Sequence, residues 1–470
     1  MKLSLSVILS AAGGDLVLGE PSIIKYSFNT DTRAILPGEI FIALKGANFD
    51  GAQFAHDAFE KGAAGIIASA LPQGTNIPDG RFYIKVENAE KALGDLAAYM
   101  RRQSKAKVMI VMGSAGKTTS KEMISLCFSP ALNLLCTHGN LNNLIGVPLT
   151  LFRLEPQTQM VVAEIGMNTS GEIRHLSEIT NPDYLVVTNI GRAHIGMFGS
   201  QAELIRAKAE VFDEIRPECL LILNADCPRM PRFLSYVRHA HQKITYGIER
   251  DAEVMAKRIQ PLEHQGYRFD VFIHGEKAAH VSLPVFGRHN IYNALAAAAS
   301  AFALGLDVKA ACAELENFKP AWMRSAVYEK KGIRIISDCY NANPDSVALA
   351  LRSLVDEGKN RRLFIVLGDM LELGEDAQQF HREVGRVAAE LRPAMLLTFG
   401  EIAHFISDEA SRSGIKANHL QSHDDICRLL LKNLREGDTL LIKGSRMMKL
   451  ETVTEKILKT LSGNKETLGE

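Results

Sequence analysis

The sequence predicts an α/β protein built from three domains. Its 470 residues exceed the size of one ordinary hydrophobic core, so about two to four domains are expected. Apolar runs of strand length alternate with helical patterns through the middle of the chain, and the alternation restarts after Phe318 and Pro320. A glycine-rich loop at residues 113–119 joins a strand to a helix. We divide the chain into domains at 1–104, 105–317 and 318–470.

The first domain begins with a short apolar run at residues 1–14, which we expect to be its opening strand or helix. This run weakly imitates a secretory signal, but its start is barely charged, which argues against that interpretation. A Pro-Gly turn precedes the predicted strand IFIAL at residues 40–44, and Gly46 and Gly51 then interrupt a polar loop large enough to bind a ligand. A helix and a strand follow within residues 57–68.

The second and third domains both read as strands separated by helices, as in a parallel sheet with crossover helices. In the second domain we predict strands at 108–112, 161–165, 184–190 and 219–223, and a buried Ala- and Leu-rich helix at 291–306. In the third we predict strands at 333–337, 363–367, 395–399 and 439–443, which together suggest a Rossmann-like sheet.

Composition excludes several classes of function. Lys plus Arg and Asp plus Glu both number 54, so no global charge attracts nucleic acid or an anionic membrane surface. No apolar run reaches the roughly 18 residues that membrane insertion needs. The seven cysteines are scattered, without zinc-ligand or redox spacing, which fits a reducing compartment and a cytoplasmic location.

The strongest chemical signal is the loop that follows the strand at 108–112. Its glycines let backbone N–H groups approach phosphate oxygens, its lysine adds a positive charge, and Thr118 can bind Mg²⁺. The general eight-residue pattern requires Gly at position 111, where this chain has Val, so the loop has a shortened form. A chance Gly-rich turn is the alternative, but the context favours ATP binding. The loop residues are Gly113, Ser114, Ala115, Gly116, Lys117, Thr118 and Thr119.

Three further residues fit a metal site less directly. Glu164 ends one predicted strand and His194 follows the next, so both side chains can meet at the carboxyl edge of one sheet. A carboxylate suits Mg²⁺, whereas His194 taken alone would more often be structural. Lys208, in the helical run 202–215, would by itself be read as a solvated surface lysine.

At these residues the chain resembles the Mur ligase family, over nearly its whole length. The shared blocks are DTR (31–33) with PGEIFIALKG (37–46), GSAGKTTSKE (113–122), GNLNNLIGVPLTLF (139–152), AEIGMNTSGEI (163–173), NIGRAHIGMFGS (189–200), GRHNIYNALAA (287–297), DCYNANPDS (338–346), LGDMLELG (367–374) and KGSRMMKLE (443–451). The resemblance implies an N-terminal UDP-binding α/β domain, a central P-loop ATPase-type domain with a parallel sheet, and a C-terminal Rossmann-like domain.

The resemblance also implies a set of site residues. UDP-sugar binding would fall to Thr32, Arg33, Lys45, Asp50 and Gly51. Beyond the loop, Asn290 would contact adenine, Arg324 the phosphates, and Asp338 the ribose. Lys208 would be carbamylated, because a desolvated neutral amine can capture carbon dioxide, and the carbamate would bind Mg²⁺ beside His194 and Glu164. The expected cofactors are therefore ATP, Mg²⁺ and a carbamylated lysine.

The motif YNANP at 340–344, and the absence of a DNPR motif, favour the branch of this family that adds a dipeptide. Its implied activity joins D-alanyl-D-alanine to UDP-N-acetylmuramoyl-tripeptide through an acyl phosphate, in a monomer. The residues assigned to the dipeptide and domain-closure region are Tyr340, Asn341, Asn343 and Ser346. Two alternatives remain: a folylpolyglutamate synthetase, which shares the short loop, and a regulatory module that uses ATP as a switch.

Three positions depart from the family pattern. Ala115 replaces the usual Asn of the loop, Gly196 stands where Glu is common, and Met323 precedes Arg324 where Gly is common. None of them removes a charge on which the predicted site depends.

Overall fold

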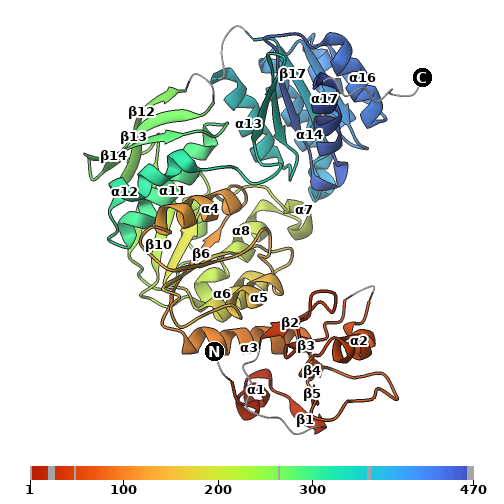
Figure 1. The fold of residues 1–470 in the computed structure, drawn as a ribbon. Coiled ribbons are helices and arrows are strands. Elements are labelled where there is room, and N and C mark those ends of the chain that lie inside the picture. Colours follow the sequence, from red (N-terminus) through yellow and green to blue (C-terminus); the bar gives the residue numbers. More distant parts are fainter. Residues whose placement is uncertain (1–2, 19–26, 47–48, 263–264, 357–360, 463–470) are drawn as a thin grey trace.

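Three sheets follow one another along the chain, and the middle sheet lies between the other two (Figure 1). The computed structural model describes residues 3–18, 27–46, 49–262, 265–356 and 361–462. Each sheet is covered by helices, so the predicted three-domain α/β class is confirmed. Within the described part of the chain, no helix has the length and apolar character needed to cross a membrane.

The first sheet has the strand order β1-β5-β4-β3-β2, and only β1 runs antiparallel to its neighbour. Its strands are β1 (Asp15–Leu18), β2 (Phe28–Asn29), β3 (Ile40–Ile42), β4 (Gly65–Ala68) and β5 (Phe82–Lys85). Its helices are α1 (Leu5–Ala12), η1 (Gly51–Phe54) and α2 (Ala55–Glu60). The opening run is thus a helix, and Ser4 caps it by accepting a hydrogen bond from Val7 N.

A long helix, α3 (Ala89–Gln103), links the first domain to the middle one (Figure 1). The Asn88 side chain caps its start by accepting from two backbone N–H groups. Near its end, the buried Arg101 donates to Thr180 O at 2.9 Å and to Asp183 Oδ2 at 3.1 Å, both in the middle domain. The helix therefore belongs to the first core but is anchored to the second.

The middle sheet has the order β14-β13-β12-β11-β10-β9-β6-β8-β7, and it is parallel from β7 to β12. Its strands are β6 (Lys107–Met112), β7 (Leu134–Cys136), β8 (Met160–Glu164), β9 (Tyr184–Val187), β10 (Leu220–Asn224), β11 (Lys243–Gly247), β12 (Val254–Pro261), β13 (Tyr267–Ile273) and β14 (Glu276–Leu283). Its helices are α4 (Lys117–Phe128), α5 (Gly146–Leu151), α6 (Glu172–Thr180), α7 (Ile195–Phe198), α8 (Gln201–Ala209), α9 (Val211–Glu214), α10 (Met230–Leu234), α11 (His289–Ala303), α12 (Val308–Ala313) and η2 (Glu314–Asn317).

The antiparallel extension β12–β14 is an element that the sequence analysis does not predict. Polar residues interrupt the apolar ones in all three strands, so the strands lack the continuous apolar runs of the parallel strands. A bulge between Lys257 and Gln260, with Arg258 at φ +55°, further interrupts the pattern.

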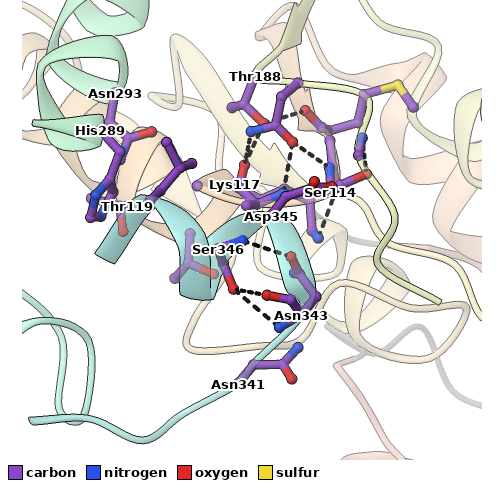
Figure 2. A pocket seen from close by; sticks show the side chains of 18 of the residues that line it. Ser114, Lys117, Thr119, Thr188, His289, Asn293, Asn341, Asn343, Asp345 and Ser346 are labelled. Carbon is purple, nitrogen blue, oxygen red and sulfur yellow. Dashed lines mark hydrogen bonds between the residues drawn. The ribbon is translucent and has the colours of Figure 1, made fainter. Parts of the chain in front are cut away.

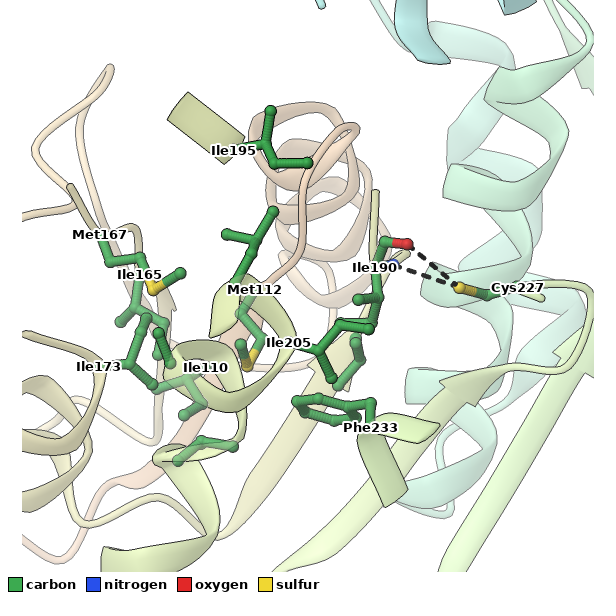
Figure 3. Close-up of a cluster of buried hydrophobic side chains, with 14 of the residues drawn as sticks. Ile110, Met112, Ile165, Met167, Ile173, Ile190, Ile195, Ile205, Cys227 and Phe233 are labelled. Carbon is green, nitrogen blue, oxygen red and sulfur yellow. Dashed lines mark hydrogen bonds between the residues drawn. The ribbon is translucent and has the colours of Figure 1, made fainter. Parts of the chain in front are cut away.

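Beneath the glycine-rich loop, the end of β6 and its neighbours pack into a dry core (Figure 3). Ile110 and Met112 of β6 contact the buried residues of β8, α6 and α8 in one apolar cluster. Ile190 N donates to Cys227 Sγ at 3.2 Å, so the chain that leaves β9 is held by a buried thiol. The loop therefore rests on close-packed side chains, which limits its movement.

The third sheet has the order β15-β16-β20-β17-β18-β19 and is parallel except for β15. Its strands are β15 (Ala326–Lys330), β16 (Ile333–Asp338), β17 (Leu363–Gly368), β18 (Met395–Phe399), β19 (Ala417–Leu420) and β20 (Thr439–Lys443). Its helices are α13 (Pro344–Asp356), η3 (Gly374–Asp376), α14 (Ala377–Glu390), α15 (His404–Arg412), α16 (His423–Asn433), η4 (Arg446–Met448) and α17 (Glu451–Leu461). The four strands predicted for this domain are all present.

Candidate active site

A cavity of about 680 Å³ lies between the middle and third domains. The cavity is lined by the glycine-rich loop, the ends of β8 and β9, the starts of α11 and α13, and β20. Seventeen of the residues singled out from the sequence line this one cavity: Gly113, Ser114, Ala115, Gly116, Lys117, Thr118, Thr119, Glu164, His194, Lys208, Asn290, Arg324, Asp338, Tyr340, Asn341, Asn343 and Ser346.

The loop itself is anchored to the end of β9 (Figure 2). Thr188 Oγ1 donates to Ala115 O at 2.6 Å, and the Asn189 amide bonds both the N–H and the carbonyl of Ala115. Gly113 has φ +146°, and a Cβ there would lie 2.0 Å from Thr188 Oγ1, so only glycine fits. Asn189 is a supporting residue that motif reading missed, because its role depends on the neighbouring strand.

Lys117 is the first residue of α4 and points back across the loop, donating to Gly113 O at 3.0 Å. Burial lowers its pKa, while the Glu164 carboxylate acts in the opposite direction. Since a triphosphate would supply further negative charge, this ammonium is placed to be stabilised by an anionic ligand.

Glu164 offers a free carboxylate oxygen to the cavity. Its Oε1 accepts from Asn142 Nδ2 at 2.7 Å, and its backbone N donates to Thr137 Oγ1 at 3.0 Å. The other oxygen, Oε2, is buried and has no hydrogen-bond partner among the described residues. A buried, unpaired carboxylate oxygen is costly unless a ligand compensates it, and a hard divalent cation would do so. This donor set therefore fits Mg²⁺.

Lys208 lies on α8 with only 4% of the residue exposed, which corrects its interpretation as a surface lysine. Burial lowers its pKa to about 7, and the nearby charge of Lys117 adds to this effect. At neutral pH a large fraction of the amine is therefore uncharged and nucleophilic. Such an amine has the chemistry needed to form a carbamate.

His194 faces the third domain. It adopts φ +66°, and its Nδ1 lies 2.5 Å from Glu372 Oε2, although the two are not aligned as a regular hydrogen bond. Within the described ranges, no group of three His, Cys, Asp or Glu side chains forms a ready-made metal site. A metal here would thus depend on Glu164 together with groups of other types, such as hydroxyl, carbamate and phosphate oxygens.

The Asn290 side chain is already engaged. Its Nδ2 donates to Phe286 O at 2.7 Å, and its Oδ1 accepts from Asn293 Nδ2 at 2.8 Å. Asn293 in turn accepts from Ser120 Oγ and lies so close to Gly116 that a Cβ there would be 2.5 Å from Asn293 Oδ1. Asn293, one helical turn beyond Asn290, was missed from the sequence, although an i, i+3 pair on one helix face would have indicated it.

Arg324 and Asp338 enter the cavity from the third domain. The Arg324 guanidinium lies 4.0 Å from the centre of the Tyr340 ring, and Asp338 Oδ2 accepts from Lys443 Nζ at 2.7 Å. Burial alone would raise the pKa of Asp338, but the Lys443 ammonium outweighs it and holds this pKa below its usual value. Met323 has φ +62°, a conformation that favours glycine.

Two of the four residues assigned to the dipeptide region serve the backbone. Asn343 Oδ1 accepts from Ser346 N at 2.9 Å, and Ser346 Oγ accepts from Asn343 N at 3.1 Å, which is a reciprocal cap at the start of α13 (Figure 2). The main-chain carbonyl oxygen of Asn341 accepts a hydrogen bond from Lys443 Nζ at 2.9 Å. These contacts aim the start of α13 at the glycine-rich loop.

The residues assigned to UDP binding lie outside the cavity, on two loops that follow the neighbouring parallel strands β2 and β3. Thr32 O accepts from Lys61, Arg33 pairs with Asp31 at 2.7 Å, and Lys45 Nζ lies 4.0 Å from Asp50. Residues 47 and 48 of the second loop lie outside the described residues. The full set is Thr32, Arg33, Lys45, Asp50 and Gly51.

Three models of known protein families match successive parts of the chain. Models described as the Mur ligase family catalytic domain, the Mur ligase middle domain, and the Mur ligase glutamate ligase domain match residues 26–101, 111–301 and 323–446. A UDP-N-acetylmuramoyl-tripeptide--D-alanyl-D-alanine ligase of Bacillus subtilis is 33% identical over 92% of this chain and 93% of that relative. The crystal structure of MurF from Acinetobacter baumannii is 31% identical, with a TM-score of 0.88 over 98% of this chain and 99% of that one. MurF ligase from Thermotoga maritima in complex with ADP is 25% identical, with a TM-score of 0.82 over 94% and 99% of the two chains.

Proposed function

The chain belongs to the Mur ligase family, and we propose that it joins D-alanyl-D-alanine to UDP-N-acetylmuramoyl-tripeptide with cleavage of ATP to ADP and phosphate. The product is the UDP-muramoyl pentapeptide of peptidoglycan synthesis. The observation that carries the proposal is one cavity that contains the glycine-rich loop, a buried carboxylate with one unpaired oxygen among the described residues, and a buried lysine whose pKa is about 7.

The reaction needs a carboxylate to be activated and then captured. The peptide carboxylate attacks the γ-phosphorus of ATP, the bond to the β-phosphate oxygen breaks, and ADP leaves with the electron pair. The dipeptide amine, after losing a proton, attacks the resulting acyl phosphate, and inorganic phosphate leaves as the amide forms. Positioning and charge stabilisation supply most of the acceleration in such phosphoryl transfers.

In this scheme Lys117 stabilises negative charge on the transferred phosphoryl group. The loop backbone, from Gly113 to Thr119, cradles the phosphates at the start of α4. Mg²⁺, held by Thr118, Glu164, His194 and the modified Lys208, would neutralise charge on the phosphate oxygens. The free Oε2 of Glu164 supports this donor set.

Lys208 acts as a carbamate. Its neutral amine attacks the carbon of CO₂, the nitrogen loses a proton, and an anion replaces a potential cation. The burial that lowers the pKa of Lys208 to about 7 favours the uncharged nucleophile. The same burial makes an unpaired charge unfavourable there, so the carbamate needs a metal partner.

The other assignments are those that the family resemblance implies. The first-domain residues Thr32, Arg33, Lys45, Asp50 and Gly51 bind the UDP sugar at the edge of β2 and β3. Asn290 acts on adenine together with Asn293, Arg324 reaches the phosphates, and Asp338 holds the ribose. Tyr340 and Asn341 face the dipeptide, while Asn343 and Ser346 maintain the start of α13. The protein acts as a monomer. It acts in the cytoplasm, where ATP and the UDP-linked substrate are available.

The test is phosphate release from ATP with Mg²⁺, UDP-N-acetylmuramoyl-tripeptide and D-alanyl-D-alanine, each omitted in turn, with mass analysis of the product. We expect release to require both substrates and to yield the pentapeptide. Release with folate and glutamate instead would favour a folylpolyglutamate synthetase. Nucleotide binding without any substrate-dependent release would favour an ATP-responsive switch.

A further inference from the structure

The segment that leaves β9, residues 191–196, contacts the third domain through Arg192, His194 and Gly196. We propose that it is a latch that holds the two catalytic domains together and sets the position of the glycine-rich loop and of His194. The latch consists of Gly191, Arg192, His194 and Gly196 on the middle domain, and of Asp345, Glu372, Gly374 and Glu383 on the third. The inference rests on the proposed function, because it assigns positioning residues for that reaction.

Arg192 makes the central contact. Its Nη2 and Nε donate to Asp345 Oδ1 at 2.9 and 3.1 Å, and its Nη1 donates to Glu383 Oε2 at 2.6 Å. Its guanidinium also lies 4.9 Å from the centre of the Phe380 ring. One side chain of the middle domain thus engages α13 and α14 of the third domain at once. Only 20% of the Arg192 side chain is exposed, so solvent screens these charge pairs less than it would on an open surface.

The same segment is bonded to the phosphate-binding loop. Gly191 N donates to Ser114 Oγ at 2.7 Å, and Arg192 N donates to Asp345 Oδ2 at 2.8 Å. A Cβ at position 191 would lie 2.7 Å from Asp345 Oδ2 and 3.1 Å from Ser114 Cβ, so the carboxylate and the loop approach the backbone from two sides. The position of α13 therefore affects the position of the glycine-rich loop through Gly191, which contacts both.

At its Gly196 end, the latch needs residues without side chains, because the two backbones approach each other closely. Gly196 N donates to Glu372 O at 2.9 Å, and a Cβ at position 196 would lie 2.2 Å from Gly374 N. This approach brings the Glu372 carboxylate to His194, and it places Ile195 and Leu373 in one buried apolar cluster. The departure at Gly196 from the family pattern is thus explained, since any side chain there would separate the two domains.

Two substitutions test the latch at its two ends. Arg192→Ala removes the ion pairs. Gly196→Ala adds a Cβ whose three nearest atoms all belong to Leu373 and Gly374 of the third domain, and alanine is compatible with helix α7 itself. For both we expect kcat for phosphate release to fall on the order of tenfold to a hundredfold, as for truncation of a buried charge pair at an interface. Arg192→Lys should restore part of the rate, because it keeps the charge but loses the bidentate geometry.

Hydrogen exchange of the full-length protein measures the latch without reference to turnover. In Arg192→Ala we expect faster exchange in peptides covering 191–199 and 370–376, since the amide of Gly196 loses its interdomain acceptor. The matched controls are Arg174→Ala, whose 2.8 Å pair with Asp213 lies within the middle domain, and Met197→Ala, the exposed neighbour of Gly196. Neither control should change exchange at these peptides.

Unchanged exchange and unchanged kcat in both Arg192→Ala and Gly196→Ala would overturn the latch. The KM for the UDP-linked substrate should remain within about twofold, because the first domain takes no part in these contacts. The proposed function can fail while the latch is correct. In that case the unsubstituted protein would release no phosphate with the two substrates, but Arg192→Ala would still exchange faster than the unsubstituted protein.

Discussion

The cavity between the middle and third domains and the sheet edge of the first domain are built in opposite ways. In the cavity, Glu164 and Lys208 are both buried. Among the described residues, one oxygen of Glu164 has no hydrogen-bond partner, and Lys208 has no carboxylate close enough for an ion pair. At the first-domain edge, Arg33 is 87% exposed at its side chain and already paired with Asp31, whose pKa this arginine lowers to about 2. In the cavity, burial leaves charged groups that a ligand would stabilise. At the first-domain edge, the charged side chains are exposed, and Arg33 pairs with a neighbouring side chain when no ligand is bound.

This difference indicates a division of labour. Buried unpaired groups store unfavourable interactions that only the correct ligand relieves, which suits a site where charge develops during reaction. Exposed and paired groups contribute to binding by exchanging one partner for another, and each exchange changes the free energy little. We therefore expect substitutions in the cavity to change kcat and those on the first domain to change KM.

The largest effect is expected for Lys208→Ala. Because we propose Lys208 as a metal ligand, its removal should lower kcat by about a thousandfold or more. Short carboxylic acids should restore part of the rate by replacing the carbamate. With ¹³C-labelled bicarbonate, the unsubstituted protein should give a carbamate NMR signal that weakens below pH 7, because the amine becomes protonated there. A signal that persists in Lys208→Ala would contradict the assignment, and exposed Lys91→Ala is the control.

Lys117→Ala should lower kcat on the order of a hundredfold or more, as does removal of one donor to a developing charge. Steady-state phosphate release measures the effect, and circular dichroism verifies that the variant is folded. Near-normal turnover would exclude Lys117 from transition-state stabilisation and would weaken the contrast between the two regions.

On the first domain, Arg33→Ala should raise KM for the UDP-linked substrate about tenfold and leave kcat unchanged, because one charge-assisted contact to a diphosphate is lost equally in the ground and transition states. Initial rates at saturating ATP and dipeptide measure this. If kcat fell instead while KM stayed constant, the first domain would take part in the chemistry, and the proposed division of labour would be wrong.

The smallest effect is expected for Ala115→Asn, which restores the residue usual in the family. An added amide should tighten the loop and raise kcat, but by no more than about threefold, because Asn189 already bonds both backbone groups of residue 115. An unchanged or lower rate would contradict the idea that Ala115 loosens the loop and slows turnover. The double variant Ala115→Asn with Asn189→Ala would then measure how much Asn at position 115 contributes to kcat when Asn189 no longer bonds the loop.

Much of the fold was readable from local pattern. Strand β18 and strand β20 have the predicted bounds, and the loop GSAGKTT lies between a strand and a helix as its composition requires. Glycine, lysine and threonine in that order specify phosphate chemistry through the backbone itself, so the prediction does not depend on distant residues. The ribbon β12–β14 was missed because polar residues interrupt the apolar ones in all three strands, and much of β12 and β14 is exposed.

The sequence by itself determined the three-domain α/β class, the phosphate-binding loop and the family to which the blocks belong, because these follow from short-range periodicity and from motifs whose residues are adjacent in the chain. Only the tertiary structure decided that Lys208 is buried, that Glu164 keeps one oxygen free, and that Arg192 joins Asp345 and Glu383. The pKa of a lysine and the partner of an arginine depend on what packs around them. Those neighbours come from segments far apart in the chain, which meet only when the domains fold and dock.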